Sequence, residues 1–166
     1  MIRRKRRPVV ELTADGYELN IEREERELVV RLLAELRALL LSDDPTTEPL
    51  RRRLFPPAYH LSDDAEAEAE YQRLMRSDLV ASRLEGINLV EAALTEGRPL
   101  DDGAIQGFMQ SLNAVRLVLG TLIDVGEGED PNDLPDSHPM LGEHHLYAYL
   151  SWLLEMTVMA VSRPGR

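Results

Sequence analysis

The 166 residues are enough for one domain with a hydrophobic core of its own, and they include no cysteine. Disulfides, thiolate zinc sites and thiol nucleophiles are therefore excluded from these residues. The formal net charge is −11, and removing the five positive charges of residues 1–7 leaves −16 for the rest, which would repel a phosphate backbone.

Residues 1–8 form a basic segment ahead of the acidic body. Its positive residues are Arg3, Arg4, Lys5, Arg6 and Arg7. We interpret the segment as a solvated, disordered tail, because a run of like charges repels itself. The alternative is contact with nucleic acid or with an acidic partner. No apolar run typical of an export signal follows, and no stretch reaches the roughly 18 apolar residues of a membrane span, so we expect a cytoplasmic protein without membrane contact.

Residues 9–21 are predicted to form a β-hairpin that turns near Asp15-Gly16. Apolar residues alternate with polar ones on both sides of the turn, as in half-buried strands, at Val10, Leu12, Leu19 and Ile21. Glycine accepts the positive φ that a tight turn needs. A two-stranded ribbon is marginally stable alone, so the hairpin should pack on the helices or on a second subunit.

A helix is predicted over residues 22–41, where apolar residues recur with a helical period. The apolar stripe consists of Leu28, Val29, Leu32, Leu33, Leu36, Leu39 and Leu40. The helix should end before Pro45, because the residue preceding a proline is pushed out of helical space.

A long connection is expected over residues 42–62, which hold four prolines. Its centre mixes arginine with aromatic residues, and both types are enriched in protein interfaces. The candidate partner-binding residues are Arg51, Arg52, Arg53, Phe55 and Tyr59.

The remaining periodic segments predict helices at about residues 63–76, 77–96, 101–124 and 143–162. Leu74 and Met75 are expected to point inward, and Ser77 marks either a break or a kink. The prediction is a single helical domain over residues 9–162. Its fold class is mostly α, an irregular bundle of four to five helices preceded by a short N-terminal β-hairpin.

Two polar residues interrupt the apolar face of the 101–124 helix. Asn113 and Arg116 are three residues apart and therefore share a face. A buried arginine needs a carboxylate or carbonyl partner, so we favour a polar clamp between helices. The alternative is a role in binding a partner.

Histidine and glycine patterns give no sign of catalysis. His144 and His145 are adjacent, so on a helix they point about 100° apart and do not easily face one metal ion. The phosphate-binding and nucleophile-elbow motifs that would indicate an enzyme do not occur. We expect no enzyme activity, no metal and no cofactor.

Aromatic residues lie on more than one side of the last helix, at Tyr147, Tyr149 and Trp152. One core cannot cover all of these sides, so some of the rings must be exposed or must contact a second subunit. A homodimer is therefore expected.

Three stretches, in the same order, resemble the AosR-like family of small actinobacterial proteins. The first joins Asp44-Pro45 to the sequence LRRRLFPPAY at 50–59, the second is LNAVRLVLG at 112–120, and the third joins SHP at 137–139 to LYAYLSWL at 146–153. The resemblance implies a transcription-linked regulator that binds a protein partner, such as a sigma factor or another transcription component. It also implies a cysteine-dependent redox sensor, and thiol–disulfide exchange cannot operate in a sequence without cysteine.

Three hypotheses for function follow. The leading one is a non-enzymatic regulatory protein that works through protein–protein contacts, without thiol redox sensing. The second is a DNA-binding regulator that uses Arg3–Arg7, aided by Arg51–Arg53. The third is a small-molecule enzyme of unknown type, which would need a pocket with converging polar groups.

Overall fold

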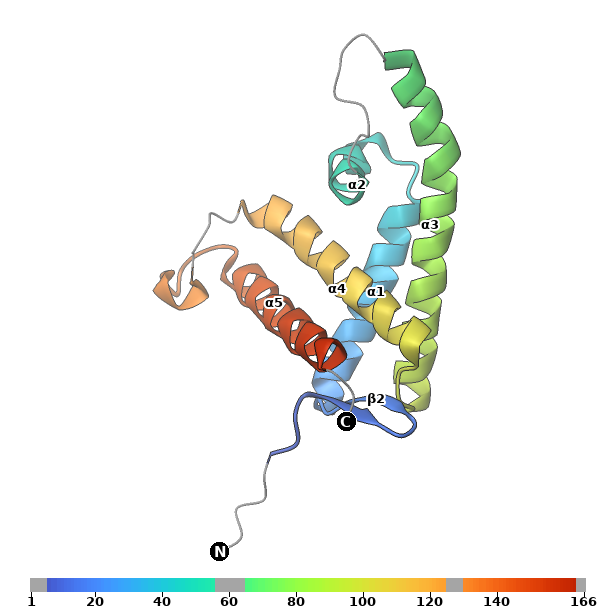
Figure 1. Ribbon diagram of the computed structural model, residues 1–166. Helices are drawn as coiled ribbons and strands as arrows, with labels where there is room; N and C mark the ends of the chain where they lie inside the picture. The colour runs from blue at the N-terminus through green and yellow to red at the C-terminus, as the bar shows by residue number, and fades with distance from the viewer. Residues whose placement is uncertain (1–5, 56–64, 125–129, 164–166) are drawn as a thin grey trace, which may run out of the picture.

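The computed structural model describes residues 6–55, 65–124 and 130–163 as a β-hairpin followed by five α-helices. Figure 1 shows the hairpin at one end of a helical bundle. The predicted fold class, a mostly α bundle preceded by an N-terminal hairpin, is confirmed. No helix in the described part of the chain is both long enough and apolar enough to cross a membrane.

The hairpin consists of β1 (Val10–Thr13) and β2 (Gly16–Leu19), which pair antiparallel with Leu12 opposite Tyr17. Gly16 adopts a φ of +126°, and a Cβ there would lie 2.6 Å from the carbonyl oxygen of Leu100. The backbones of Tyr17 and Leu100 exchange two hydrogen bonds of 2.8 Å. The ribbon is thus fastened to the chain between two helices, so its anchoring is satisfied within one subunit.

The helices are α1 (Arg23–Leu41), α2 (Glu48–Leu54), α3 (Ala65–Glu96), α4 (Asp102–Ile123) and α5 (Leu141–Ser162), with 3₁₀ turns at Pro45–Thr47 and Pro131–Asp133. Two helices were expected at 63–76 and 77–96, and that division is wrong, because α3 runs through Ser77 without interruption. Serine and aspartate start helices but are also tolerated inside them, and no glycine or proline lies between Ala65 and Glu85. The segment 42–62 also differs from the predicted connection, since it contains α2.

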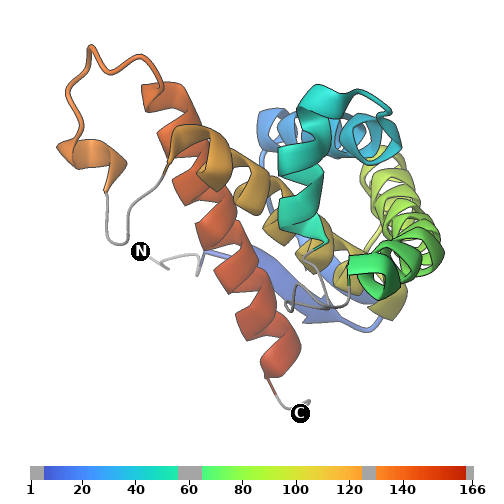
Figure 2. The ribbon, with the colours of Figure 1, turned by 90° about the horizontal axis from the view of Figure 1, so that it is seen from above.

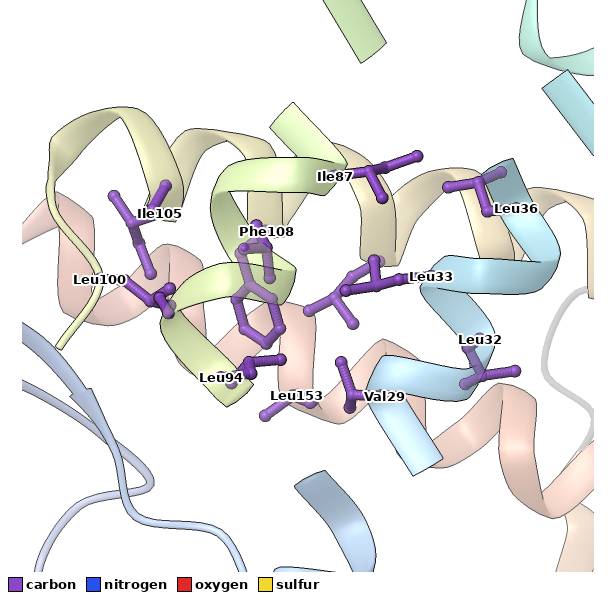
Figure 3. Packing of buried hydrophobic residues seen from close by; sticks show 14 of the residues in the cluster. Val29, Leu32, Leu33, Leu36, Ile87, Leu94, Leu100, Ile105, Phe108 and Leu153 are labelled. Carbon is purple, nitrogen blue, oxygen red and sulfur yellow. The ribbon is translucent and has the colours of Figure 1, made fainter. Parts of the chain in front are cut away.

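The hydrophobic core lies where α1, α3, α4 and α5 meet. Figure 3 shows Phe108 of α4 among side chains from the neighbouring elements, including Leu33 and Leu153. The backbones of α3 and α4 approach closely at Gly86 and Gly107, where the two helices cross. Viewed from above, α4 separates α5 on one side from α3 on the other (Figure 2).

Candidate interaction surfaces

The segment that carries the predicted arginines folds as a 3₁₀ turn followed by α2. The Asp44 carboxylate accepts a hydrogen bond of 2.9 Å from the Thr46 backbone and so starts the turn. Pro49 stands in the first turn of α2, where its missing N–H is not needed. The short helix ends at Phe55, which is 7% exposed and belongs to the core.

Glu48 at the start of α2 is the centre of an arginine cluster. Its carboxylate lies 2.7 Å from Arg51, 3.6 Å from Arg52 and 3.3 Å from Arg76 of α3. The hydrogen bond from Arg76, together with the charges of Arg76 and Arg51, holds the pKa of the Glu48 carboxyl below its ordinary value. This carboxylate therefore ties α2 to α3.

The five predicted partner-binding residues fall into different environments. The Arg51 side chain is used within the fold. Besides its ion pair with Glu48, its guanidinium donates a 2.5 Å hydrogen bond to the Ser42 carbonyl. Phe55 is buried, which makes it a poor contact for a partner. Tyr59 lies outside the described residues. Arg52 and Arg53 are exposed, although the Arg52 guanidinium also lies 3.6 Å from Glu48.

The first half of α3, which the Glu48–Arg76 ion pair joins to α2, carries exposed apolar side chains. Leu74 is 60% exposed, Met75 40% and Leu79 39%. The prediction that Leu74 and Met75 point inward is therefore wrong. Figure 1 shows the reason, since this part of α3 extends past the ends of α1 and α4. We call the exposed residues of this region the α2–α3 end, which comprises Arg52, Arg53, Leu74, Met75 and Leu79.

Asn113 and Arg116 meet as their spacing predicted, but within one helix. The Arg116 guanidinium donates a 3.0 Å hydrogen bond to the Asn113 side-chain oxygen. The same guanidinium lies 6.0 Å from the centre of the Tyr147 ring on α5, within reach of a cation–π contact. The Arg116 Nε atom is buried without a hydrogen-bond partner. Beyond its bond within α4, Arg116 thus contacts α5 through an aromatic ring.

A narrow pocket of about 30 Å³ lies between α2 and the three helices beneath it. Its walls include Leu40, Phe55, Arg83 and Asn113. This volume holds about one or two water molecules. The pocket is therefore too small for a substrate in the conformation described.

The described part of the basic segment, Arg6 to Pro8, lies at the opposite end of the molecule from α2. Arg3, Arg4 and Lys5 are outside the described residues. Arg6 is exposed, and the Arg7 guanidinium lies 4.0 Å from the Glu18 carboxylate on the hairpin. Figure 1 places the hairpin far from α2. Arg6 and Arg7 therefore share no surface with Arg52 and Arg53.

The histidines that open α5 have separate environments. His144 is 5% exposed, and its ring packs edge-on against His138 with 5.3 Å between centroids. His145 is exposed. Within residues 6–55, 65–124 and 130–163, no group of three or more histidine, aspartate and glutamate side chains is arranged to hold a metal ion.

Comparison with known proteins identifies the family of the chain and some of its relatives. A family model described as a domain of unknown function, DUF2017, matches residues 5–161. The chain belongs to this family. Its curated relatives include proteins described as oxidative stress regulator AosR, from Mycobacterium bovis (strain ATCC BAA-935 / AF2122/97) and from Mycobacterium tuberculosis (strains CDC 1551 / Oshkosh and ATCC 25618 / H37Rv).

The DUF2017 chain is 25% identical to these regulators over 128 residues, which is 69% of its own length. The match spans 58% of the length of each regulator, so the relatives contain more chain than is shared. The resemblance to the AosR-like family is confirmed at this level. No solved structure matches the chain.

Proposed function

We propose that this DUF2017 chain is a non-enzymatic regulatory protein that binds a protein partner in a transcription-linked role, without thiol redox sensing. The relatives described as oxidative stress regulators support the regulatory role. The absence of cysteine from the 166 residues supports a mechanism that does not use a thiol. A sigma factor or another component of transcription in the cytoplasm is the partner that the family resemblance implies.

The observation that carries this proposal is the set of exposed apolar side chains on the first half of α3. Leu74, Met75 and Leu79 lie where α3 extends past the ends of α1 and α4, and no element within the described residues buries them. Most of the stability of a helix in a protein comes from packing one face, so an unpacked end gains stability when a partner covers it.

The arginines beside this apolar surface indicate what the partner offers. Arg52 and Arg53 are the exposed cations of the α2–α3 end, and arginine and methionine are both enriched in interfaces. Glu48 pairs with Arg51, Arg52 and Arg76, so of the two exposed arginines Arg53 is the one whose charge this carboxylate leaves unpaired. The matching partner surface has an apolar groove for Leu74 and Met75 and carboxylates at its rim.

Affinity capture from the native cell tests the proposal. Leu74→Glu and the pair Arg52→Glu and Arg53→Glu should each abolish recovery of the same partner that the unchanged protein captures. Arg51 is left intact, because its contacts with Ser42 and Glu48 hold the fold.

Matched control variants make the same kinds of substitution at exposed positions outside the α2–α3 end. Arg31→Glu reverses an exposed charge on α1, and Leu122→Glu places a carboxylate on an exposed leucine of α4. Both should leave recovery unchanged. Equal recovery with the Leu74 and Leu122 variants would contradict the assignment of the α2–α3 end.

A further inference from the structure

Helix α5 has an outward face that the described chain leaves uncovered and nearly without charge. Its inward face packs Leu150, Leu153 and Thr157 into the core. On the opposite side, Trp152 is 41% exposed and Met159 is 45% exposed. A helix that is apolar all round is normally covered on all sides, so this face requires a partner.

The outward residues form a regular stripe with alternating steps of four and three positions. The stripe consists of Leu141, His145, Ala148, Trp152, Glu155 and Met159. All of these residues are exposed or half-buried. This spacing is the two-per-heptad seam by which two helices pack side by side.

The two ends of this stripe complement each other. A pair of antiparallel stripes centred between Ala148 and Trp152 sets a small residue opposite a large one. The same register sets His145 opposite Glu155 and Leu141 opposite Met159. A parallel pair would instead place Trp152 on Trp152 and Glu155 on Glu155, with like charges in contact.

Charge elsewhere on the molecule favours the same helix. The chain carries −11 overall, so two copies repel each other over most of their surfaces. Between Leu141 and Ser162 the only carboxylates are Glu143 and Glu155, and only Glu155 lies on the stripe. The outward stripe of α5 therefore offers a second acidic copy a face with a single carboxylate.

A groove beside the stripe provides room for the tryptophan of a second copy. It measures about 350 Å³ and lies between the 3₁₀ turn at Pro131 and the α5 residues Ala148, Ser151 and Trp152. The Ser151 hydroxyl in its wall is buried without a hydrogen-bond partner. Ala148 in the same wall is the small residue that the antiparallel register sets opposite Trp152.

We propose that two copies of this chain dimerise through α5 in an antiparallel pair, with Trp152 of each copy packed on Ala148 of the other. His145 of one copy pairs with Glu155 of the other at both ends of the contact. This interface is independent of the α2–α3 end. One pair of helices about 33 Å long buries less than the standard interface of about 800 Å² per partner, so the dimer is expected to dissociate in the micromolar range.

Sedimentation velocity over a concentration series tests the dimer itself. Trp152 is the only tryptophan in the sequence, so its fluorescence should shift to shorter wavelength over the same concentrations at which the dimer forms. Trp152→Ala should raise the dissociation constant by at least about tenfold, as expected for a central aromatic anchor. A chain that stays monomeric up to roughly a hundred times the expected micromolar range would overturn the proposal.

Substitutions that exchange the charges at positions 145 and 155 test the antiparallel register of the two α5 helices. His145→Glu alone sets two carboxylates opposite each other, and Glu155→Lys alone sets a cation opposite histidine, so each change should weaken the dimer. The double variant carries both changes, pairs glutamate with lysine and should restore dimerisation.

Glu143→Lys makes the same charge change on the same helix but off the stripe, and it should dimerise like the unchanged protein. All the altered side chains are exposed, and thermal melts by circular dichroism confirm that each variant is folded. If Glu155→Lys and Glu143→Lys behave alike, or if the double variant fails to dimerise, the antiparallel register is wrong.

Discussion

Replacing Gly107 with alanine should destabilise the protein, because α3 and α4 cross there with backbone against backbone. The new Cβ would lie 2.8 Å from the carbonyl oxygen and 2.9 Å from the Cα atom of Gly86. These are main-chain atoms of a helix, so they cannot rotate out of the way. The two helices must therefore separate by about 0.5 Å or more to reach ordinary contact distance.

The size of the effect follows from two opposing contributions. Alanine in a helix is favoured over glycine by about 1 kcal/mol. Overpacking a core costs about 1–3 kcal/mol, and the upper end applies here, because separating the helices also loosens the contacts of Ile87 and Phe108. The net expectation is a loss of about 2 kcal/mol in the free energy of unfolding.

Urea denaturation followed by circular dichroism measures this loss at a fixed protein concentration. Gly103→Ala is the matched control in the same helix, because its Cβ would lie 3.6 Å from Asp101 and 3.7 Å from Leu89, which is ordinary contact. The control should be unchanged or up to about 1 kcal/mol more stable. If the two alanine variants unfold at the same urea concentration, the described crossing of α3 and α4 is refuted.

Substitutions at three further positions test other parts of the fold by the same measurement. Asp101→Ala should cost about 1 kcal/mol and Asp101→Asn much less, because the side chain caps α4 by accepting a 2.8 Å hydrogen bond from Ala104. Phe55→Ala should cost about 3 kcal/mol, since it empties a core position under α2. The Glu48 carboxyl has a lowered pKa in the folded state, so its stabilisation, about 1 kcal/mol, is present above its ordinary value of 4.5 and is lost as pH falls below it. Glu48→Gln should remove this part of the acid sensitivity.

Local patterns predicted the elements that local chemistry determines. The period of residues 22–41 predicted α1 to within one residue at its start. The hairpin was predicted from strand alternation around Asp15-Gly16. Its anchoring on Leu100 could not be predicted, because that contact joins residues more than 80 positions apart. The seven-residue α2 was missed because it is too short to show a helical period.

The helical period of the sequence could not predict which side chains are exposed to solvent. The spacing of Leu74 and Met75 from Tyr71, three and four residues, indicates an apolar helix face, but it does not say whether another element covers that face. In the structure nothing within the described ranges covers Leu74, while Phe55 of the expected surface segment is buried. The spacing of Glu48 to Arg51 and Arg52 is a sequence signal for the arginine cluster that the prediction did not use.

The placement of α5 determines what a dimer would present to a partner. Because α4 lies between α5 and α3, a contact on the outward face of α5 leaves the α2–α3 end of each copy exposed (Figure 2). Two such ends in one particle would engage a target with two sites by intramolecular capture of the second site. Weakening the α5 pair should then lower the apparent affinity for a two-site partner while leaving the affinity for an isolated single site unchanged. The apparent affinity of the protein for a two-site partner would then rise as its own concentration passes through the dimerisation range. The contacts that each α2–α3 end makes would not change.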